Sequence, residues 1–501
     1  MINPDIIKKF AGEECKPRVL VVTDMWFSKE NAIFQGFSLY QFVNTLLKAG
    51  IEVTRANLVP YSGEPEGTLL GFKFDDQDNG LSREKYDVCF IFASDFSPNF
   101  PNLPDLSQEE LAAIEKFMDE GGGVFATGDH EDLGARTCKD IHRVRGMRKW
   151  LWDSDDPDNF NNAPSISGVN RHSTILPGDE EVYHFDDQSD RHLQRLFLNR
   201  RTYAGGRQDN SIPEQPMLPH PLMQAPDNKA IVHIPDHPHE GECVIPGNAE
   251  LEDKNEWPLE IGSSNKQIVP EIVAKSMSHG GYLHDIMAKE PLVPREFIAI
   301  AAYDGHSAGV GRVVTDATWH HFIDINIDGT GSIDPDTGLP RTALILGDDE
   351  KLKLGEREVK RIAQQWDRLQ QHWRNLAEWL MPPQGRRRHA AVVHIADAVK
   401  SIPLDVLISL PADSLDDLGR RIKTNLDSKL LPYQVNDLVE TVLAMGISDP
   451  VKRKTARDAN NQIQLVALGA LAAALSELEE GTVEEMLAKL EEAVAAAVES
   501  V

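Results

Sequence analysis

Acidic and histidine side chains follow several buried strand-like runs of this sequence, at the points where the runs end. Carboxylates and imidazoles gathered in one cleft can act as general acids and bases or bind a metal ion. In an open parallel sheet the carboxyl ends of the strands meet at one edge, where ligands bind. We therefore predict a polar site there, fed by six runs. Its candidate residues are Asp24, Asp95, Asp129, His130, Asp236, His237, His239, Glu240, Asp304, His306, Asp316, Trp319, His320 and His321.

These residues divide by predicted role. The catalytic candidates follow the runs at 123–130 and 311–317, which bring acids and histidines together; they are Asp129, His130, Asp316, His320 and His321. The substrate-binding candidates are Asp24, Asp95, Asp304, His306 and Trp319. The alternative for any single aspartate is structural, because Asp after a strand often caps a helix or closes a turn.

The segment DHPHEGE (236–242) has the composition of a metal site. His237 and His239 are two residues apart, so they share a face if the backbone is extended, and Asp236 and Glu240 flank them. Nitrogen and oxygen donors of this kind suit Zn, Mn or Fe. Pro238 and the absence of a known spacing signature leave a metal-free acid/base site as the alternative.

The stretch DINIDGTGSIDPDTG (324–338) is spelled like the start of an EF-hand calcium loop. Asp324, Asn326 and Asp328 occupy the first, third and fifth ligand positions, but Pro335 stands where a bidentate glutamate is needed. The sequence therefore argues against calcium as the cofactor, and weak binding through Asp334 or Asp336 is the minor alternative.

Short β-branched runs alternate with helix-like segments in the first half of the chain. Strands are predicted at 18–27, 51–58, 86–96 and 123–130, and helices at 36–50 and from Ser107 to the glycines at 121–123. Ser107 and Glu110 have the spacing of a capping box. Strand–helix–strand order implies parallel crossovers, so we predict a doubly wound, mostly parallel α/β sheet. Later runs at 229–235, 296–304 and 311–317 are expected to add strands.

The chain divides into an α/β domain at 1–345 and an all-α C-terminal region. Within the first, residues 135–295 are Pro- and Asn-rich and are predicted to be largely insertions that build walls over the site. A heptad-patterned connecting helix is predicted at 350–383, and a helical assembly or docking domain at 386–501. The seam of the connecting helix requires another helix against it, supplied either by its own domain or by self-association. Its members are Val359, Ile362, Trp366, Leu369, Trp373, Leu376 and Leu380.

Bulk composition limits the class of partner. The 501 residues carry a formal charge of −29, which repels phosphate backbones and anionic lipid, so we expect neither nucleic acid nor membrane as a partner. The basic cluster at 142–149 is interpreted as a solvated face. No signal peptide or membrane span is evident, and four scattered cysteines suit the reducing cytoplasm.

The order of elements resembles the class I glutamine amidotransferase-like superfamily, and within it the trehalose-utilisation-protein-like branch. The resemblance covers about residues 16–330 and is carried by VLVVTD, LAAIEKFMDEGGGVFATGDHEDLG and GVGRVVTDATWHHF. It implies a flavodoxin-like sheet, with Asp129 and His130 at the elbow and His320 and His321 after the last strand. Amidotransferases of this kind carry a cysteine in a G-x-C-x-G elbow, whereas here the turn reads Thr127-Gly128-Asp129-His130. A cysteine-dependent glutaminase is therefore not expected.

Two functions fit these patterns. The first is a divergent hydrolase of a small polar substrate, working through the Asp/His site with or without a metal ion. The second is a non-catalytic ligand-binding or scaffold protein. In either case, residues 350–501 are expected to join the chain to copies of itself or to a protein partner.

Overall fold

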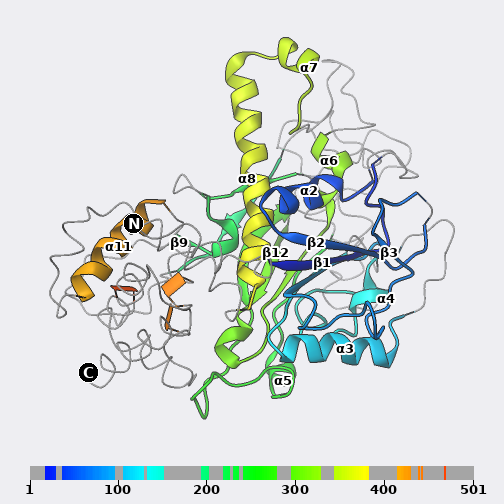
Figure 1. The fold of residues 1–501 in the computed structure, drawn as a ribbon, viewed down its shortest axis with the longest axis vertical. Helices are drawn as coiled ribbons and strands as arrows, with labels where there is room; N and C mark the ends of the chain where they lie inside the picture. The colour runs from blue at the N-terminus through cyan, green and yellow to red at the C-terminus, as the bar shows by residue number, and fades with distance from the viewer. Residues whose placement is uncertain are drawn as a thin grey trace, which may run out of the picture.

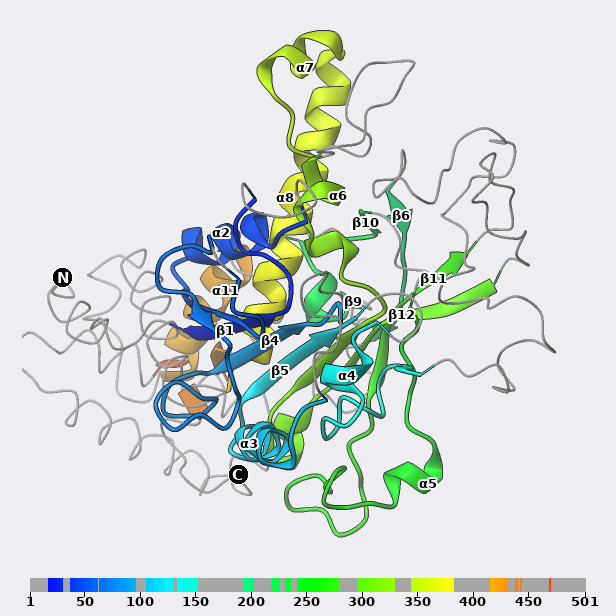
Figure 2. The same ribbon diagram turned by 90° about the vertical axis from the view of Figure 1, so that its right-hand side faces the viewer.

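A computed structural model gives the fold of the chain (Figures 1 and 2). It describes residues 17–29, 37–61, 63–95, 105–128, 133–151, 193–201, 218–225, 230–235, 241–278, 295–328, 344–382, 415–429, 438–439, 442–443 and 468–469. These residues form an α/β protein built on a mixed, mostly parallel sheet of nine strands.

The order of strands in the sheet is β3-β2-β1-β4-β5-β13-β12-β11-β7. Its parallel part consists of β3 (Leu69–Leu70), β2 (Glu52–Asn57), β1 (Arg18–Thr23), β4 (Val88–Phe92), β5 (Gly123–Thr127) and β13 (Val313–Asp316). The sheet continues through β12 (Arg295–Tyr303), β11 (Glu271–Ser278) and β7 (Phe197–Leu198), each antiparallel to the strand before it. The predicted strands at 18–27, 51–58, 86–96, 123–130, 296–304 and 311–317 are all present.

Two apolar cores lie on opposite faces of the sheet because successive side chains of a strand point to opposite sides. Val19 and Val21 of β1 belong to one core, and Leu20 and Val22 belong to the other. Helices α2 (Tyr40–Lys48) and α8 (Glu356–Leu380) cover the first face, and α3 (Gln108–Asp119) covers the second (Figure 1). The strands β4 and β5 are buried along their whole length, as their unbroken apolar sequences predict.

Helix α3 has the predicted capping box. Ser107 Oγ accepts a hydrogen bond from Glu110 N, and Glu110 Oε2 accepts one from Ser107 N. The glycines that follow α3 also permit close packing, since a Cβ on Gly123 would collide with the carbonyl of Leu380 at the end of α8. The glycines at 121–123 thus end α3 and allow the end of α8 to pack closely against the start of β5.

The remaining elements are short. Two-stranded sheets pair β6 (Gln194–Arg195) with β10 (His233–Ile234) and β8 (Arg200–Arg201) with β9 (Leu218–Pro219). The short helices are α4 (Ala135–Cys138), η3 (Pro221–Met223), α5 (Asn248–Leu251), η4 (Gly305–Ala308), η5 (His320–Phe322), α6 (Asp324–Asp328) and α7 (Asp348–Lys353). A further helix, α11 (Leu415–Lys429), lies in the C-terminal region.

Two sequence-based expectations about the sheet are wrong. β12 runs antiparallel to β13, so its carboxyl end reaches the opposite edge of the sheet from the other predicted strand ends. The run at 229–235 yields only the two-residue strand β10, which pairs with β6 outside the main sheet. Within 135–295, residues 271–278 form the main-sheet strand β11, and the prediction that this range is largely insertions stays a prediction. The direction of a strand is set by the neighbour with which it pairs, which local sequence does not encode.

The heptad seam of α8 packs on its own domain in the second half of the helix. Leu369, Trp373, Leu376 and Leu380 lie in the core between α8 and the sheet, while Ile362 and Trp366 are half-buried beside it. The first turns of α8, together with α7, project beyond the sheet and α2 (Figures 1 and 2). Self-association through residues 350–501 stays a prediction.

The basic cluster at 142–149 is not a solvated face, because Arg143 and Arg148 are fully buried. The guanidinium of Arg143 donates to Asp119 Oδ1 and to the carbonyl of Glu256. Arg143 therefore links the end of α3 to the segment that contains Glu256. Among the helices described, none combines the length and the apolar composition that crossing a membrane requires.

Candidate functional site

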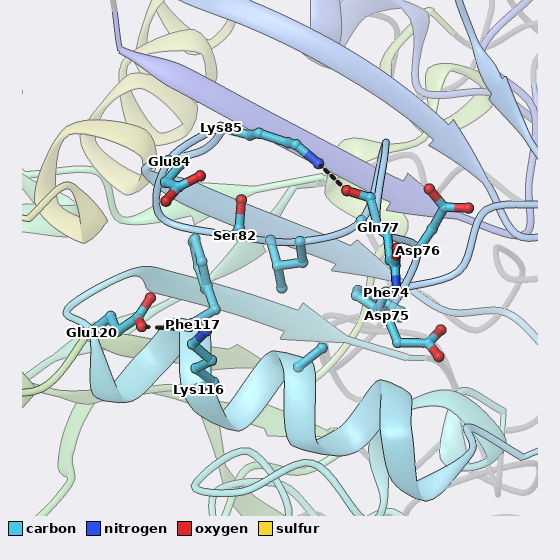
Figure 3. Close-up of a pocket in the computed structure, with 13 residues that line it drawn as sticks. Phe74, Asp75, Asp76, Gln77, Ser82, Glu84, Lys85, Lys116, Phe117 and Glu120 are labelled. Atoms are coloured by element: carbon cyan, nitrogen blue, oxygen red, sulfur yellow. Dashed lines mark hydrogen bonds and ion pairs between the residues drawn. The ribbon is translucent and has the colours of Figure 1, made fainter.

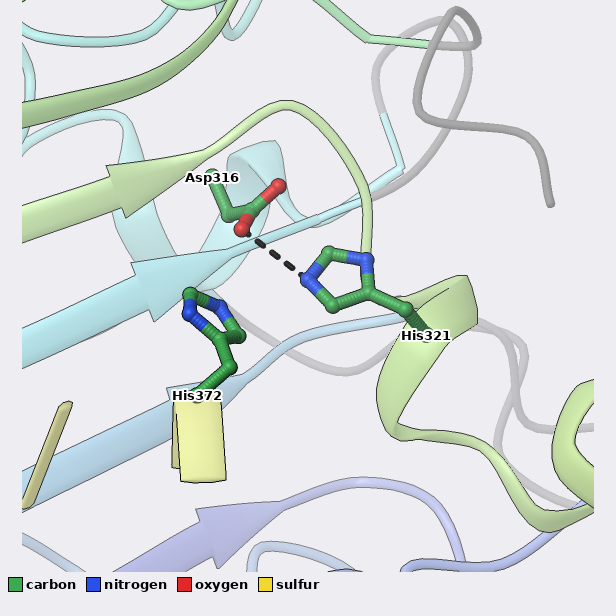
Figure 4. Close-up of side chains that lie close together, drawn as sticks. All are labelled: Asp316, His321 and His372. Atoms are coloured by element: carbon green, nitrogen blue, oxygen red, sulfur yellow. Dashed lines mark ion pairs between the residues drawn. The ribbon is translucent and has the colours of Figure 1, made fainter. Parts of the chain in front are cut away.

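Three titratable side chains from three elements converge beside the sheet (Figure 4). Asp316 is the last residue of β13, His321 lies in η5, and His372 lies in α8. One potential ligand atom from each lies within 4.8 Å of the other two. Their exposed fractions are 1%, 0% and 0%, so the cluster is removed from bulk water.

Local packing directs His321 back toward the end of β13. Trp319 N donates to the carbonyl of Gly128, which follows β5, at 3.1 Å, and the chain then makes the 3₁₀ turn η5. Phe322 anchors this turn, since its ring packs against Phe92 and Phe125 on the sheet. The turn therefore holds His321 over the strand ends.

The orientation of His372 is set by a backbone carbonyl. His372 Nδ1 lies 3.0 Å from Leu222 O in η3, and because a carbonyl only accepts, Nδ1 carries the proton. Burial, followed by the proximity of His321, lowers the pKa of His372 to about 4, so the ring is neutral at physiological pH. Its lone pair is therefore on Nε2, which has no hydrogen-bond partner among the described residues. A backbone acceptor on the far nitrogen is the usual support of a metal-binding histidine.

Asp316 and His321 approach closely without forming a hydrogen bond. His321 Nε2 lies 3.1 Å from Asp316 Oδ2, yet neither atom has a well-directed hydrogen bond with any described group. The short distance alone contributes little, because a hydrogen bond weakens steeply when its N–H is poorly aligned. Two buried polar atoms at this separation match neighbouring ligands of one ion, which lie about 3–3.5 Å apart in a tetrahedral zinc site.

The donor set fits a borderline transition metal. Two imidazole nitrogens and one carboxylate oxygen suit zinc, iron or manganese, the metals expected from the sequence, and the set has neither thiolates nor an all-oxygen shell. An ion would also satisfy the atoms that the described residues leave without partners. The cluster therefore has the composition and the geometry to hold a divalent metal.

A buried arginine supports the backbone beside Asp316. Arg148 Nε donates to the carbonyl of Asp316 at 3.1 Å, and its NH2 group donates to the carbonyl of Ala317 at 2.9 Å. The guanidinium also lies over the ring of Trp150, 4.5 Å from its centroid. These contacts fix the backbone of the strand end, so Arg148 positions Asp316 through its main chain.

The neighbouring predicted catalytic residue, His320, is held elsewhere. Its Nδ1 lies 2.7 Å from Asn326 Nδ2, and its ring stacks on that of Trp319 with 4.6 Å between centroids. Trp319 in turn meets Phe37 edge to face. Of the two adjacent histidines, the structure thus brings only His321 to Asp316.

Asp24 and Asp95 form a second acidic pair at the same edge of the sheet. Asp24 follows β1, which is separated from β13 by β4 and β5. Asp24 Oδ1 accepts hydrogen bonds from Ser94 N and Ser94 Oγ, at 2.8 and 3.0 Å, while Oδ2 has no partner among the described residues. Burial, and then the charge of Asp95, raises the pKa of Asp24 to about 7. Asp95 itself caps α4 by accepting from Arg136 N, as in the structural alternative for a lone aspartate.

Asp304 and His306 are not brought to this edge. They follow the antiparallel strand β12, and Asp304 Oδ1 accepts from Arg312 Nε at 2.7 Å. Arg312 also donates to the carbonyl of Trp379 in α8. The expectation that these two residues line the predicted site is corrected by the direction of β12.

The remaining site predictions lie outside the described residues. They are Asp129 and His130 at the elbow, and Asp236, His237, His239 and Glu240 in the predicted metal segment. The described residues next to both segments lie near Asp316: Gly128 bonds Trp319, and Gly241 packs so tightly on the carbonyl of Ala317 that a Cβ would collide with it. The predicted roles of both segments stay predictions.

The calcium-like residues are engaged in other contacts. The carboxylate of Asp324 accepts from Ser38 Oγ and from the amides of Tyr40 and Gln41, which caps the start of α2. Asn326 bonds His320, and Asp328 pairs with Lys29. Residues 329–343 lie outside the described part. The polar side chains of residues 324–328 therefore make hydrogen bonds and an ion pair within the protein.

A second cluster of titratable side chains is a weaker candidate. His142, Asp253 and Glu256 also lie close together, but Glu256 is already paired with Arg145 at 2.6 Å, and a fixed cation disfavours a second one.

A surface pocket of about 270 Å³ lies between α3 and the loop before β4 (Figure 3). It is lined by Phe74, Asp75, Asp76, Gln77, Gly80, Leu81, Ser82, Glu84, Lys85, Ala113, Lys116, Phe117 and Glu120, none of which belongs to the predicted site. The surface pocket and the cluster of Asp316, His321 and His372 thus lie in different places, and the cluster is the stronger candidate site because its titratable side chains converge.

Comparison of the chain with protein-family models, with curated proteins and with solved structures found no match. The resemblance to the glutamine amidotransferase-like superfamily therefore stays a prediction.

His372 is the residue that the sequence patterns missed. It is three residues after Leu369 and four before Leu376, so it lies on the buried face of α8. The available signal is a histidine next to the heptad seam, on the apolar face of an amphipathic helix.

Proposed function

We propose that this protein is a hydrolase that acts on a small polar substrate at a divalent-metal site formed by Asp316, His321 and His372. The observation that carries the proposal is the convergence of these three buried side chains, whose facing atoms have no hydrogen-bond partner among the described residues. A buried carboxylate and a buried imidazole that face each other without a well-directed hydrogen bond are costly unless a cation joins them.

The residues of the cluster have separate tasks in this proposal. Asp316 supplies the negative charge, and the neutral His372 supplies a lone pair that Leu222 O aims into the cluster. His321 completes the set, and Arg148 holds the strand end in place. A divalent ion bound there would supply Lewis acidity and lower the pKa of a coordinated water toward neutrality, which is the chemistry of metal-assisted hydrolysis.

Two further observations support the class of site and of substrate. The parallel strands follow one another across the sheet as β2-β1-β4-β5-β13, which is the order of flavodoxin-like sheets, and such sheets bind ligands beyond their carboxyl ends. Asp24, with its second oxygen lacking a described partner, lies on the same edge and could bond a hydroxyl or amide group of a substrate. Both agree with the family resemblance and with a small polar substrate.

The test is metal content and hydrolysis measured on the same full-length preparations. We expect about one zinc, iron or manganese ion per chain, and hydrolysis of p-nitrophenyl esters or phosphates that depends on it. Asp316→Asn and His372→Gln should lose both, whereas the matched control His233→Gln, a half-buried histidine outside the cluster, should lose neither. A His237→Ala/His239→Ala variant that alone loses the metal would move the site to the segment predicted from sequence. Wild type without metal or hydrolysis would overturn the proposal.

The complete burial of the three ligands favours a second candidate, a non-catalytic binding or scaffold protein in which the ion is structural. Closed coordination suits a structural site, whereas catalysis needs a position open to substrate. Stoichiometric metal with no hydrolysis of any model substrate, combined with lost stability in the Asp316→Asn variant, would favour this candidate.

A further inference from the structure

The candidate site is assembled from two parts of the chain that are distant in sequence. Asp316 and His321 belong to the sheet and the turn that follows it, whereas His372 comes from α8, which covers one face of the sheet. Figure 4 shows the two parts facing each other, with His372 reaching across from the helix. The site is therefore incomplete unless α8 is docked.

The docked half of α8 buries apolar side chains together with the polar Gln371, His372 and Asn375. Trp373 packs on Phe42 and Phe322, and Leu376 and Leu380 lie in the same core. His372 Nε2 is buried there with no described partner. An unsatisfied nitrogen in an apolar contact opposes docking, and a cation shared with Asp316 and His321 would remove that cost.

The segment η3 aligns His372 with the cluster. Asn375, one turn further along α8, donates from Nδ2 to the carbonyls of Leu222 and Gln224 at 3.2 and 2.8 Å. Leu222 O also accepts from His372 Nδ1. Docking of α8 against η3 thus fixes the ring of His372 in the orientation that presents Nε2 to the other two ligands.

We infer that the metal ion is a clasp that couples ion binding to the docking of α8 on the sheet. The inference rests on the metal site of the proposed function. Because an ion that binds only the docked form stabilises it, metal affinity and α8 docking rise and fall together. All three ligands are buried, so the ion enters and leaves only when α8 separates from the sheet, and exchange of the metal is slow.

Hydrogen exchange of the full-length protein, stripped of metal and then given one equivalent of Zn²⁺, tests this coupling. We expect amides of residues 369–380 to exchange about tenfold more slowly with Zn²⁺, while amides of α3 on the opposite face are unchanged. Zn²⁺ release to a chromogenic chelator should proceed no faster than the opening rate of residues 369–380. His372→Gln should remove the zinc-dependent protection, and the wild-type comparison stands even if that variant folds poorly.

The outcomes separate the inference from the proposed site. Stoichiometric Zn²⁺ binding with unchanged exchange of residues 369–380, or with release faster than their opening, overturns the clasp and leaves the metal site intact. Failure of the wild type to bind Zn²⁺, Fe²⁺ or Mn²⁺ overturns both.

Discussion

At the scale of single residues, Asp316, His321 and His372 differ from the other buried polar side chains in what their free atoms face. Asp324 is equally buried, but a hydroxyl and two amides satisfy its carboxylate. Asp24 is half satisfied, through Ser94. Asp316 Oδ1 accepts from Thr318 N at 3.4 Å, whereas Oδ2 faces imidazole nitrogens and has no hydrogen-bond partner among the described residues, which is the arrangement that a cation stabilises.

Replacement of Arg148 should test how far the strand end depends on its buried guanidinium. Arg148→Gln removes the guanidinium donor from the carbonyls of Asp316 and Ala317 and leaves a cavity in a buried position, so we expect a loss of about 2–4 kcal/mol in the free energy of unfolding. Urea denaturation measures it, and Arg361→Gln is the matched control. Arg361 pairs with Glu358 on the surface of α8, where the loss should stay within about 0.5 kcal/mol. Equal losses in the two variants would show that Arg148 has no special structural role.

The raised pKa values predict how stability changes with pH. Burial raises the pKa of Asp24 and of Asp324 from 3.8 to about 7, so between these values the folded state holds protons that the unfolded chain has released. Their contribution to stability is full below the lower value and is lost as pH rises through the higher one. The pKa of His372 is lowered from 6.5 to about 4, so its contribution to stability is full above the higher value and is lost as pH falls through the lower one.

Asp24→Asn isolates one of these groups. Relative to wild type, the variant should gain stability as pH is raised from about 5 to about 8, because it has no charge to bury at the upper end. Urea unfolding at several pH values measures the difference, and Asp348→Asn, at an exposed position, serves as the control. Parallel curves for wild type and Asp24→Asn would contradict the raised pKa.

At the scale of elements, glycines and helix ends determine how α8 meets the sheet. Gly123 begins β5 directly beneath the carbonyl of Leu380, and Arg312 donates to the carbonyl of Trp379 from β13's side. The last turn of α8 is therefore fixed to the amino ends of two strands. His372, two turns earlier, then lies over their carboxyl ends.

A single methyl group at Gly123 should disturb this contact. Gly123→Ala forces α8 away from β5, and we expect a loss of about 2–4 kcal/mol in the free energy of unfolding, as for an overpacked core. Gly355→Ala is the control: Gly355 precedes α8, has open space around it, and should change stability by less than about 1 kcal/mol. Equal free energies of thermal or urea unfolding for the two variants would show that the close contact between Gly123 and Leu380 does not affect stability.

The elements that local patterns specify were predicted well, and those that depend on distant neighbours were not. The capping residues of α3 and the buried runs of β1, β4 and β5 carry their own signals in composition and spacing. β12 has an equally clear strand sequence, but its direction follows from pairing with β13, a non-local property. Asp304 and His306 were consequently assigned to the wrong edge.

At the scale of the whole molecule, the candidate site joins the α/β sheet to the helix that leads toward the C-terminal region. In α11 of that region, Leu418, Ile422 and Leu426 form a buried stripe at helical spacing, which indicates packing against a further element. Whether residues 350–501 also bind a second copy or another protein stays a prediction.

Zinc should stabilise the folded protein as a whole. At a free concentration one hundred times its dissociation constant, an ion that binds only the folded state adds about 2.7 kcal/mol, which for a chain of this size raises Tm by about 2–3 °C. Differential scanning calorimetry with Zn²⁺ or with a chelator measures the shift. His372→Gln should show none, and an equal shift in wild type and variant would mean that the ion binds elsewhere.

Local sequence patterns predict the α/β class, the strands β1, β2, β4, β5, β12 and β13, the capped helix α3, and the presence of Asp316 and His321 at a strand end. Their signals are local: periodicity, capping spacing, and the residues that directly follow a strand. Only the tertiary structure decided that His321, and not His320, meets Asp316, that β12 turns away, and that His372 completes the cluster. These three outcomes depend on how η5 turns, how β12 pairs with β13 and how α8 docks, and each is fixed by packing between residues distant in the chain.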